Sequence, residues 1–239
     1  LFPYTTLFRS TSLSGTADIV KYDFGYEIDP VWEAGNKNIP GIYIEFKEPW
    51  LNPKGFEQIV YDVLANTQDM NIIEKPEPED TPFYINNGTI NVGNTNGKVI
   101  LQTFSLESLV RVAEVFQGKV PMCFLLWKGT GATDLTYDDP LGYASFINLG
   151  VKYKAHFIGP CIAGAPNDYP ELDQPWQDYL IHRAKMKNHP YTFDTYDQMA
   201  KYFGQYNFGV ADGMFNPPYL DALFTNHSDM SINYMITHG

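Results

Sequence analysis

A glutamate and a lysine two positions apart, Glu45 and Lys47, are the residues of this sequence whose types and spacing most suggest chemistry. They lie in the run 41–47, whose β-branched and aromatic residues are typical of a strand. Because side chains of a strand alternate between its faces, Glu45 and Lys47 share one face while Ile44 and Phe46 point to the core. A carboxylate and an ammonium at the end of a strand can hold a metal ion and a phosphate. The alternative interpretation, an ion pair on a half-exposed strand, has about even weight on this segment alone.

Strands and helices alternate along the chain after residue 40, which predicts parallel βα units. About six segments have the pattern of a strand, and the segments between them carry apolar residues at helical spacing. The strands are expected at 41–47, 98–103, 122–127, 156–159, 188–193 and 221–226. Helices are expected after Asn52-Pro53, Ser105, Asp139, Gln174 and Thr195, with a short helical stretch near 230–235.

The pattern predicts an α/β fold of (β/α)8 TIM-barrel type. No Gly-rich phosphate loop stands at a strand–helix junction, which disfavours a doubly wound nucleotide-binding sheet. An intact barrel needs eight strands and roughly 250 residues, so we expect an incomplete barrel with about six strands, the first two missing. The loops 128–138 and 160–173 follow strands and should cover the site, whereas 74–97 and 205–219 follow helices and should lie at the opposite end.

The chain divides into three segments. Residues 1–10 resemble the translation of a sequencing-library adapter, and we treat them as a non-native tag outside the fold. Residues 11–40 contain no convincing strand–helix pair and are interpreted as a linker or excursion remnant, and residues 41–239 as the partial barrel. The first methionine is Met70, so we expect the N-terminal part of the protein to be missing.

The composition excludes some partners. A net charge of −12 disfavours nucleic acid and anionic membrane surfaces, where basic patches dominate. No apolar run approaches the roughly 18–20 residues of a membrane span. Cys123 and Cys161 lack the spacing of metal ligands, and Cys123 lies in an apolar run typical of core packing. Because the net charge is negative, a phosphate site would need positively charged residues gathered at one place on the surface.

Four segments in this order resemble the glycerophosphodiester phosphodiesterase family, especially its periplasmic bacterial branch. They are GIYIEFKEPW for the family's Glu-x-Lys strand, VILQTFSLESL for its Gln-containing strand and helix, HPYTF for its seventh strand and LDALFTNHSD for its last. The match runs from about residue 40 to the C-terminus, and its order makes it fairly specific. It implies metal-dependent hydrolysis of a small-molecule glycerophosphodiester to an alcohol and glycerol 3-phosphate. It also suggests a periplasmic or secreted protein, although the sequence leaves the compartment unknown.

The resemblance gives four residues a role. Glu45 would be one of three carboxylates that hold a divalent cation, Ca²⁺ or Mg²⁺. Lys47 would contact the substrate phosphate, Gln102 would lie at the next strand end, and Tyr191 would form part of the wall around the glycerol. A hard cation prefers oxygen ligands, and with a lysine it offsets negative charge in the transition state. The alternatives are that Tyr191, like other strand aromatics, packs in the core, and that Gln102 satisfies neighbouring backbone. His189 could line the site or be structural.

The sequence departs from the family in its catalytic motifs. The family's His-Arg motif on the first strand and His-Asp motif after the second are absent, as are the two carboxylates between them, so we assign no catalytic residue. His182-Arg183 copies the first dipeptide but lies in an expected helix. Ala222, Asn226 and Ser228 replace the family's glycine, aspartate and proline in the last strand region. The chain as given is therefore expected to be inactive.

Three hypotheses remain open. The first is a phosphodiesterase with glycerophosphodiester substrates. The second is a lipid phosphodiesterase on the same type of barrel, which an apolar rim on the loops 128–138 and 160–173 would favour. The third is a barrel without catalytic activity that serves in binding.

Overall fold

The computed structural model describes residues 42–47, 49–66, 85–86, 89–90, 99–118, 120–128, 136–168, 170–203 and 220–238. The predicted tag 1–10, the predicted linker 11–40, the loop 205–219 and most of the loops 74–97 and 128–138 lie outside these ranges. Among the described residues, no helix has the length and apolar character needed to cross a bilayer.

A five-stranded parallel sheet forms the centre of the molecule, with its strands in the order β1-β4-β5-β6-β7. The strands are β1 (Ile42–Glu45), β4 (Val99–Thr103), β5 (Met122–Leu126), β6 (Phe157–Pro160) and β7 (Lys187–Asn188). All four pairings are parallel, and the order follows the chain without reversal. A doubly wound sheet reverses its order at a switch point, and the five described strands show no such reversal. The observed topology is compatible with part of a barrel.

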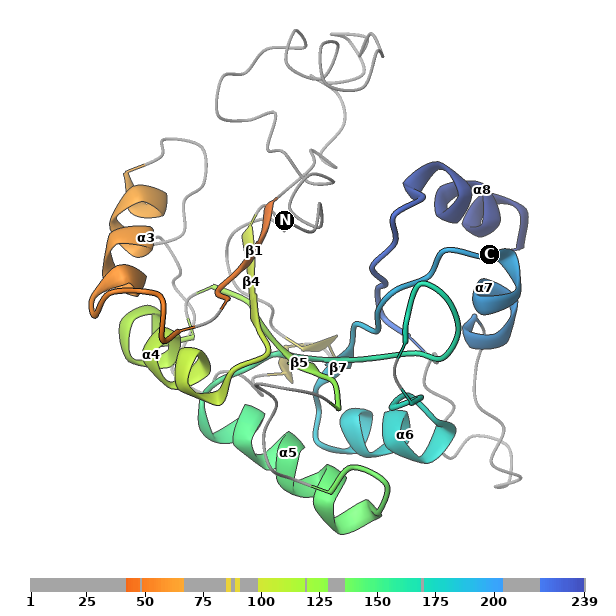
Figure 1. The fold of residues 1–239 in the computed structure, drawn as a ribbon, viewed down its shortest axis with the longest axis horizontal. Coiled ribbons are helices and arrows are strands. Elements are labelled where there is room, and N and C mark those ends of the chain that lie inside the picture. The colour runs from red at the N-terminus through yellow and green to blue at the C-terminus, as the bar shows by residue number, and fades with distance from the viewer. Residues whose placement is uncertain are drawn as a thin grey trace, which may run out of the picture.

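Helices follow the strands and lie along the outer side of the curved sheet (Figure 1). They are α3 (Phe56–Ala65), α4 (Leu106–Phe116), α5 (Pro140–Lys152), α6 (Pro175–Arg183), α7 (Tyr196–Tyr202) and α8 (Ser228–His238). The expected caps form: the side chains of Ser105, Asp139 and Thr195 accept hydrogen bonds from backbone N–H groups of the first turn. The Asn52-Pro53 pair predicted that this helix begins directly after it, but α3 begins at Phe56, after Gly55.

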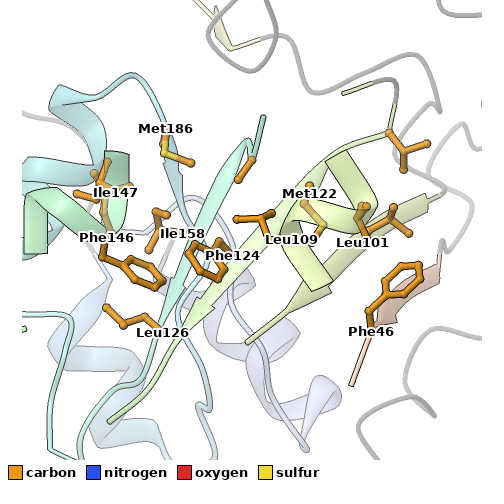
Figure 2. Close-up of a cluster of buried hydrophobic side chains, with 14 of the residues drawn as sticks. Phe46, Leu101, Leu109, Met122, Phe124, Leu126, Phe146, Ile147, Ile158 and Met186 are labelled. Atoms are coloured by element: carbon orange, nitrogen blue, oxygen red, sulfur yellow. The ribbon is translucent and has the colours of Figure 1, made fainter. Parts of the chain in front are cut away.

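The main core lies between the sheet and helices α3, α4, α5 and α6 (Figure 2), and a separate cluster includes Met199 and Tyr202 of α7 and Tyr234 of α8. The ring of Phe124 on β5 stacks on Phe146 of α5 with 4.3 Å between centroids. Every residue of β5 is buried, because one face packs on the helices and the other faces the inside of the curve. Cys123, predicted as core, is fully buried on that inner face with Leu125 and Phe157.

The two edges of the sheet approach each other through side chains on the inner face. Tyr43 of β1 contacts Phe224, near the other edge, with ring centroids 4.8 Å apart. Its hydroxyl also lies 3.2 Å from Nδ1 of His189, just after β7. The sheet is therefore strongly curved, although β1 and β7 each pair with one strand only within the described part of the chain.

The last two predicted strands are less regular than expected. Of the predicted strand 188–193, only Asn188 belongs to β7 (Lys187–Asn188), and Tyr191 forms an isolated bridge with Cys161. Residues 220–227 run beside this segment as extended chain without a regular strand. The N–H groups of His189 and Tyr191 bond to the β6 segment, so position 190 faces residues 220–227. Because Pro190 has no N–H to donate, the ladder on that side is interrupted. The backbone bonds between the two segments are irregular: Asp221 N and Ala222 N both donate to Asn188 O, at 2.9 and 3.3 Å, while Phe224 N donates to Pro190 O at 3.1 Å and Phe193 N to Phe224 O at 2.8 Å.

A short antiparallel hairpin was not predicted. Its strands are β2 (Ile85–Asn86) and β3 (Thr89–Ile90), within the long segment between α3 and β4. The sequence pattern of this segment, rich in Asn and Gly, led us to expect a loop.

Candidate functional site

Glu45 and Lys47, which we call the rim pair, lie where β1 ends. Lys47 Nζ is 3.6 Å from Glu45 Oε2, and the side chains are 49% and 7% exposed, respectively. Burial raises the pKa of the Glu45 carboxyl above its ordinary value, and the Lys47 ammonium offsets part of this shift. The predicted ion pair therefore forms, with a largely buried carboxylate and a lysine that solvent can reach.

Gln102 lies beside Glu45 across the β1–β4 pairing, where the two residues are register partners. The register is fixed locally: Phe46 N donates to Gln102 O at 2.8 Å, and Thr103 Oγ1 donates to Phe46 O at 2.8 Å. The side chain of Gln102 is buried. The structure thus brings Glu45, Lys47 and Gln102 together at the carboxyl edge of adjacent parallel strands, as predicted.

Tyr191 belongs to a group of three aromatic side chains, Phe104, Trp127 and Tyr191, which we call the aromatic group. Phe104 contacts Trp127 with 5.8 Å between ring centroids and Tyr191 with 5.6 Å. The Tyr191 hydroxyl donates to Leu126 O at 2.9 Å. These contacts give Tyr191 a packing role at the end of β5, in line with the core alternative, while its ring is partly exposed.

His189 is a buried structural residue. Its ring stacks on Phe157 at 4.0 Å between centroids. Burial lowers the pKa of His189 to about 4, although Asp221 partly opposes this shift. The imidazole is therefore neutral near pH 7, and it accepts or donates one hydrogen bond with the Tyr43 hydroxyl.

A metal site is not evident among the described residues, since they contain no group of three or more His, Cys, Asp or Glu side chains that could hold an ion. Glu45 and the neighbouring Gln102 amide supply oxygen atoms of the kind that Ca²⁺ and Mg²⁺ prefer. One carboxylate is nevertheless fewer than a protein usually provides for Ca²⁺.

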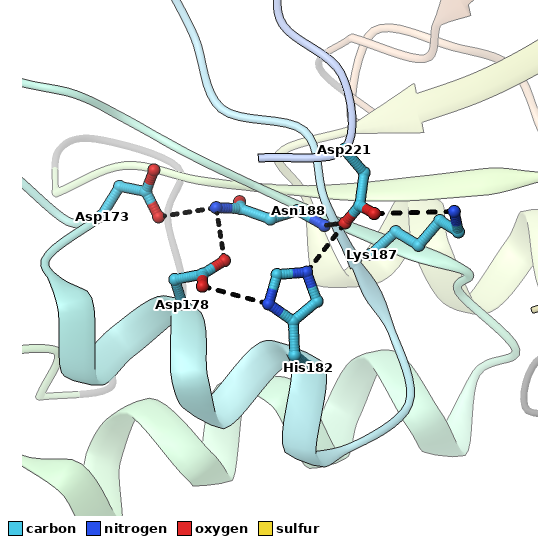
Figure 3. Close-up of polar contacts among 6 residues, drawn as sticks. All are labelled: Asp173, Asp178, His182, Lys187, Asn188 and Asp221. Atoms are coloured by element: carbon cyan, nitrogen blue, oxygen red, sulfur yellow. Dashed lines mark hydrogen bonds and ion pairs between the residues drawn. The ribbon is translucent and has the colours of Figure 1, made fainter. Parts of the chain in front are cut away.

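A polar network that the sequence analysis missed connects α6, β7 and the segment 220–227 (Figure 3). We call it the His182 network; it consists of Asp173, Asp178, His182, Lys187, Asn188 and Asp221. His182 Nδ1 lies 3.0 Å from Asp178 Oδ2, and His182 Nε2 lies 2.9 Å from Asp221 Oδ2. As predicted, His182-Arg183 lies within a helix.

Asn188 and Lys187 extend the network on the sheet side. The Asn188 amide donates to Asp173 Oδ1 and to Asp178 Oδ1, each at 2.9 Å, and its backbone N–H donates to Asp221 Oδ2 at 2.8 Å. Lys187 Nζ lies 3.5 Å from Asp221 Oδ1. Asp178 and His182 are four residues apart on a predicted helix, which is the one signal that could have revealed the pair.

The network favours the protonated form of His182. Burial alone would lower its pKa, but the hydrogen bonds and charges of Asp178 and Asp221 outweigh this effect and raise the pKa to about 9. Burial raises the pKa of Asp221, but His182 and the Asn188 N–H outweigh it and leave this pKa below its ordinary value. Because both ring nitrogens of His182 already have carboxylate partners, the imidazolium is suited to hold elements together rather than to transfer a proton to a ligand.

Asn226 replaces the aspartate expected from the family resemblance, and the structure gives it a partner. Its side-chain Nδ2 donates to Asp194 Oδ2 at 2.8 Å, and its backbone N–H donates to Asp194 Oδ1 at 2.9 Å. A carboxylate at this position would face Asp194 with like charge.

Comparison of the chain with models of known protein families, and with curated proteins, gives no match.

Proposed function

We propose that this chain forms part of a (β/α)8 barrel of the glycerophosphodiester phosphodiesterase type, with the rim pair in the phosphate-binding site. The observation that carries the proposal is the position of Glu45, Lys47 and Gln102 at the carboxyl edge of β1 and β4. In parallel βα barrels this edge carries the active site. The unreversed strand order and the contact between Tyr43 and Phe224 across the curve support a barrel.

Lys47 is suited to bind a phosphate. Its ammonium is half exposed, so an anion can approach it without first being buried. A lysine binds phosphate as a point charge, and a charge-assisted hydrogen bond contributes about 1.5–3 kcal/mol. Since the chain as a whole is strongly acidic, an anion would need a local positive charge such as that of Lys47.

Glu45 is proposed as one ligand of a divalent cation, Ca²⁺ or Mg²⁺. A cation beside Glu45 would supply positive charge next to the phosphate oxygens, and it would release Lys47 from part of its ion pair. The described residues contain no group of three or more side chains that could hold a metal ion, so the cation part of the proposal rests on Glu45 alone. No residue is proposed as the general acid or base, because the family's histidine motifs are absent from the sequence.

The cation proposal is tested by titrating glycerol 3-phosphate into the 239-residue protein by calorimetry, with and without CaCl₂ or MgCl₂. We expect the cation to strengthen binding to the wild type but not to Glu45→Gln, which keeps the shape but loses the charge. Glu107→Gln changes an exposed carboxylate on α4 and serves as the matched control. An undiminished cation effect in Glu45→Gln would show that this residue is not a ligand.

Hydrolysis provides a separate test. We expect no turnover of glycerophosphocholine above background, because a positioned acid–base pair alone contributes about 10²–10⁴-fold. Robust hydrolysis that survives Glu45→Gln and Lys47→Met would place the active site elsewhere in the chain.

A further inference from the structure

Two large apolar side chains, Trp50 and Leu51, project into solvent beside the rim pair. They lie in the turn 49–52 between β1 and α3, and they are 63% and 69% exposed. The turn begins two residues after Lys47, so it stands at the same edge of the sheet as the candidate site. Neighbouring exposed apolar side chains can form part of a surface that contacts a membrane or another protein.

The backbone of this turn is held in place by several hydrogen bonds. Asn52 N donates to Pro49 O at 3.2 Å, and Asn52 Nδ2 donates to Lys47 O at 2.8 Å. From α4, the Arg111 guanidinium donates to Pro49 O at 3.1 Å and to Pro53 O at 3.0 Å. Apolar side chains on a fixed turn lose less conformational entropy on binding than those on a loose loop.

The Arg111 side chain is held in position by two glutamates. It pairs with the buried carboxylate of Glu57 at 3.0 Å and lies 3.8 Å from Glu107 on its own helix. Arg111 is largely buried, and it connects α4 to Glu57 of α3 and to two carbonyl groups of the turn by charge-assisted hydrogen bonds. It stabilises the turn in the conformation that displays Trp50 and Leu51.

The charged residues around the turn indicate which kind of surface could bind it. Exposed Lys47 and Lys54 flank the two apolar residues, with Glu48 between them in the sequence. The net charge of −12 disfavours an anionic surface, while the two lysines favour phosphate groups. Indole rings prefer the boundary between lipid headgroups and acyl chains, where an apolar body and a polar N–H are both satisfied.

We propose that the turn 49–52 binds this protein to the surface of a zwitterionic phospholipid bilayer, with Trp50 and Leu51 inserted among the headgroups. Such a surface has no net charge, because quaternary ammonium groups balance its anionic phosphodiesters. It therefore combines an apolar layer for the two side chains with phosphates for the lysines. The proposal goes beyond hydrolysis and does not require the rim pair to bind glycerol 3-phosphate. A negative result for membrane binding therefore does not contradict the proposed phosphate site, and the reverse also holds.

Sedimentation with phosphatidylcholine vesicles tests the proposal. The variant Trp50→Ser/Leu51→Ser should lower the partition coefficient by about tenfold or more, since two apolar side chains no longer leave water. The control Ile59→Ser/Val63→Ser removes two apolar residues of α3 that are 57% and 61% exposed, and it should bind as the wild type does. Absence of wild-type binding, or equal loss in both variants, would overturn the proposal.

A second measurement avoids the double variant. Brominated phosphatidylcholine should quench the fluorescence of the wild type, and Trp50→Phe, which keeps an aromatic ring, should remove most of that quenching while vesicles still bind. Quenching that persists in Trp50→Phe would assign the contact to another of the four tryptophans and contradict the proposal. Stronger binding to vesicles that contain phosphatidylserine would contradict the charge argument. Self-association in place of vesicle binding, lost in Trp50→Ser/Leu51→Ser, would instead identify the turn as an interface between copies.

Discussion

The rim pair and the His182 network both place a cation against carboxylate groups, but they differ in what they leave available to a ligand. Lys47 contacts the Glu45 carboxylate at 3.6 Å and remains half exposed. His182 contacts two carboxylates at about 3 Å through both ring nitrogens and is almost buried. We therefore expect the network to contribute to stability, and we propose the rim pair for recognition. Buried and fully bonded charge is a poor guide to a site, whereas a half-exposed charge at the edge of a parallel sheet is a better one.

The largest expected effect comes from removing the central residue of the His182 network. His182→Leu leaves the Asp178 and Asp221 carboxylates without their shared cation, and we expect a loss of about 3–5 kcal/mol in the free energy of unfolding. Urea denaturation followed by circular dichroism measures it. A loss below about 1 kcal/mol, typical of an exposed pair, would show that the two regions do not differ as described.

The next effect is a dependence of stability on pH. Because the pKa of His182 rises from 6.5 in the unfolded chain to about 9 in the folded one, its contribution is complete below about pH 6.5. It is lost as pH rises through about 9, and the shift corresponds to roughly 3 kcal/mol. Asp221 has a lowered pKa, so its contribution is lost instead as pH falls below its ordinary value of 3.8. Denaturation of the wild type and His182→Leu from pH 5 to 10 should show a steeper fall in stability between about pH 6.5 and 9 for the wild type than for the variant.

The smallest effect on stability is expected at the rim. Lys47→Met should change the free energy of unfolding by less than about 1 kcal/mol, because exposed ion pairs contribute little. The same denaturation experiment checks this value. A loss of unfolding free energy as large as that of His182→Leu would show that the rim pair stabilises the fold, and it would contradict its proposed role in binding.

Much of the fold could be predicted because local pattern and tertiary packing agree. The apolar runs of β4 and β5 and the caps Ser105, Asp139 and Thr195 fall where periodicity and cap chemistry indicate. The end of the sheet was harder to predict. Pro190 removes a donor on the side that faces 220–227, so a segment with the composition of a strand lies there as extended chain.

The candidate site could be predicted only in part. The alternation of a strand and the register of neighbouring strands are local rules, and they place Glu45, Lys47 and Gln102 correctly. Tyr191 was harder to place, because its hydroxyl bonds to the backbone of Leu126, 65 residues earlier. The His182 network joins residues from three elements, and no spacing in the sequence relates Asp221 to His182.

The most direct test of a phosphate site at the rim is the affinity of Lys47→Met for glycerol 3-phosphate, compared with Lys54→Met as an exposed control lysine. We expect calorimetric titration to show about tenfold weaker binding for Lys47→Met, equivalent to one charge-assisted hydrogen bond, and unchanged binding for Lys54→Met. Equal affinity in the wild type and Lys47→Met would contradict the assignment of Lys47 to the phosphate.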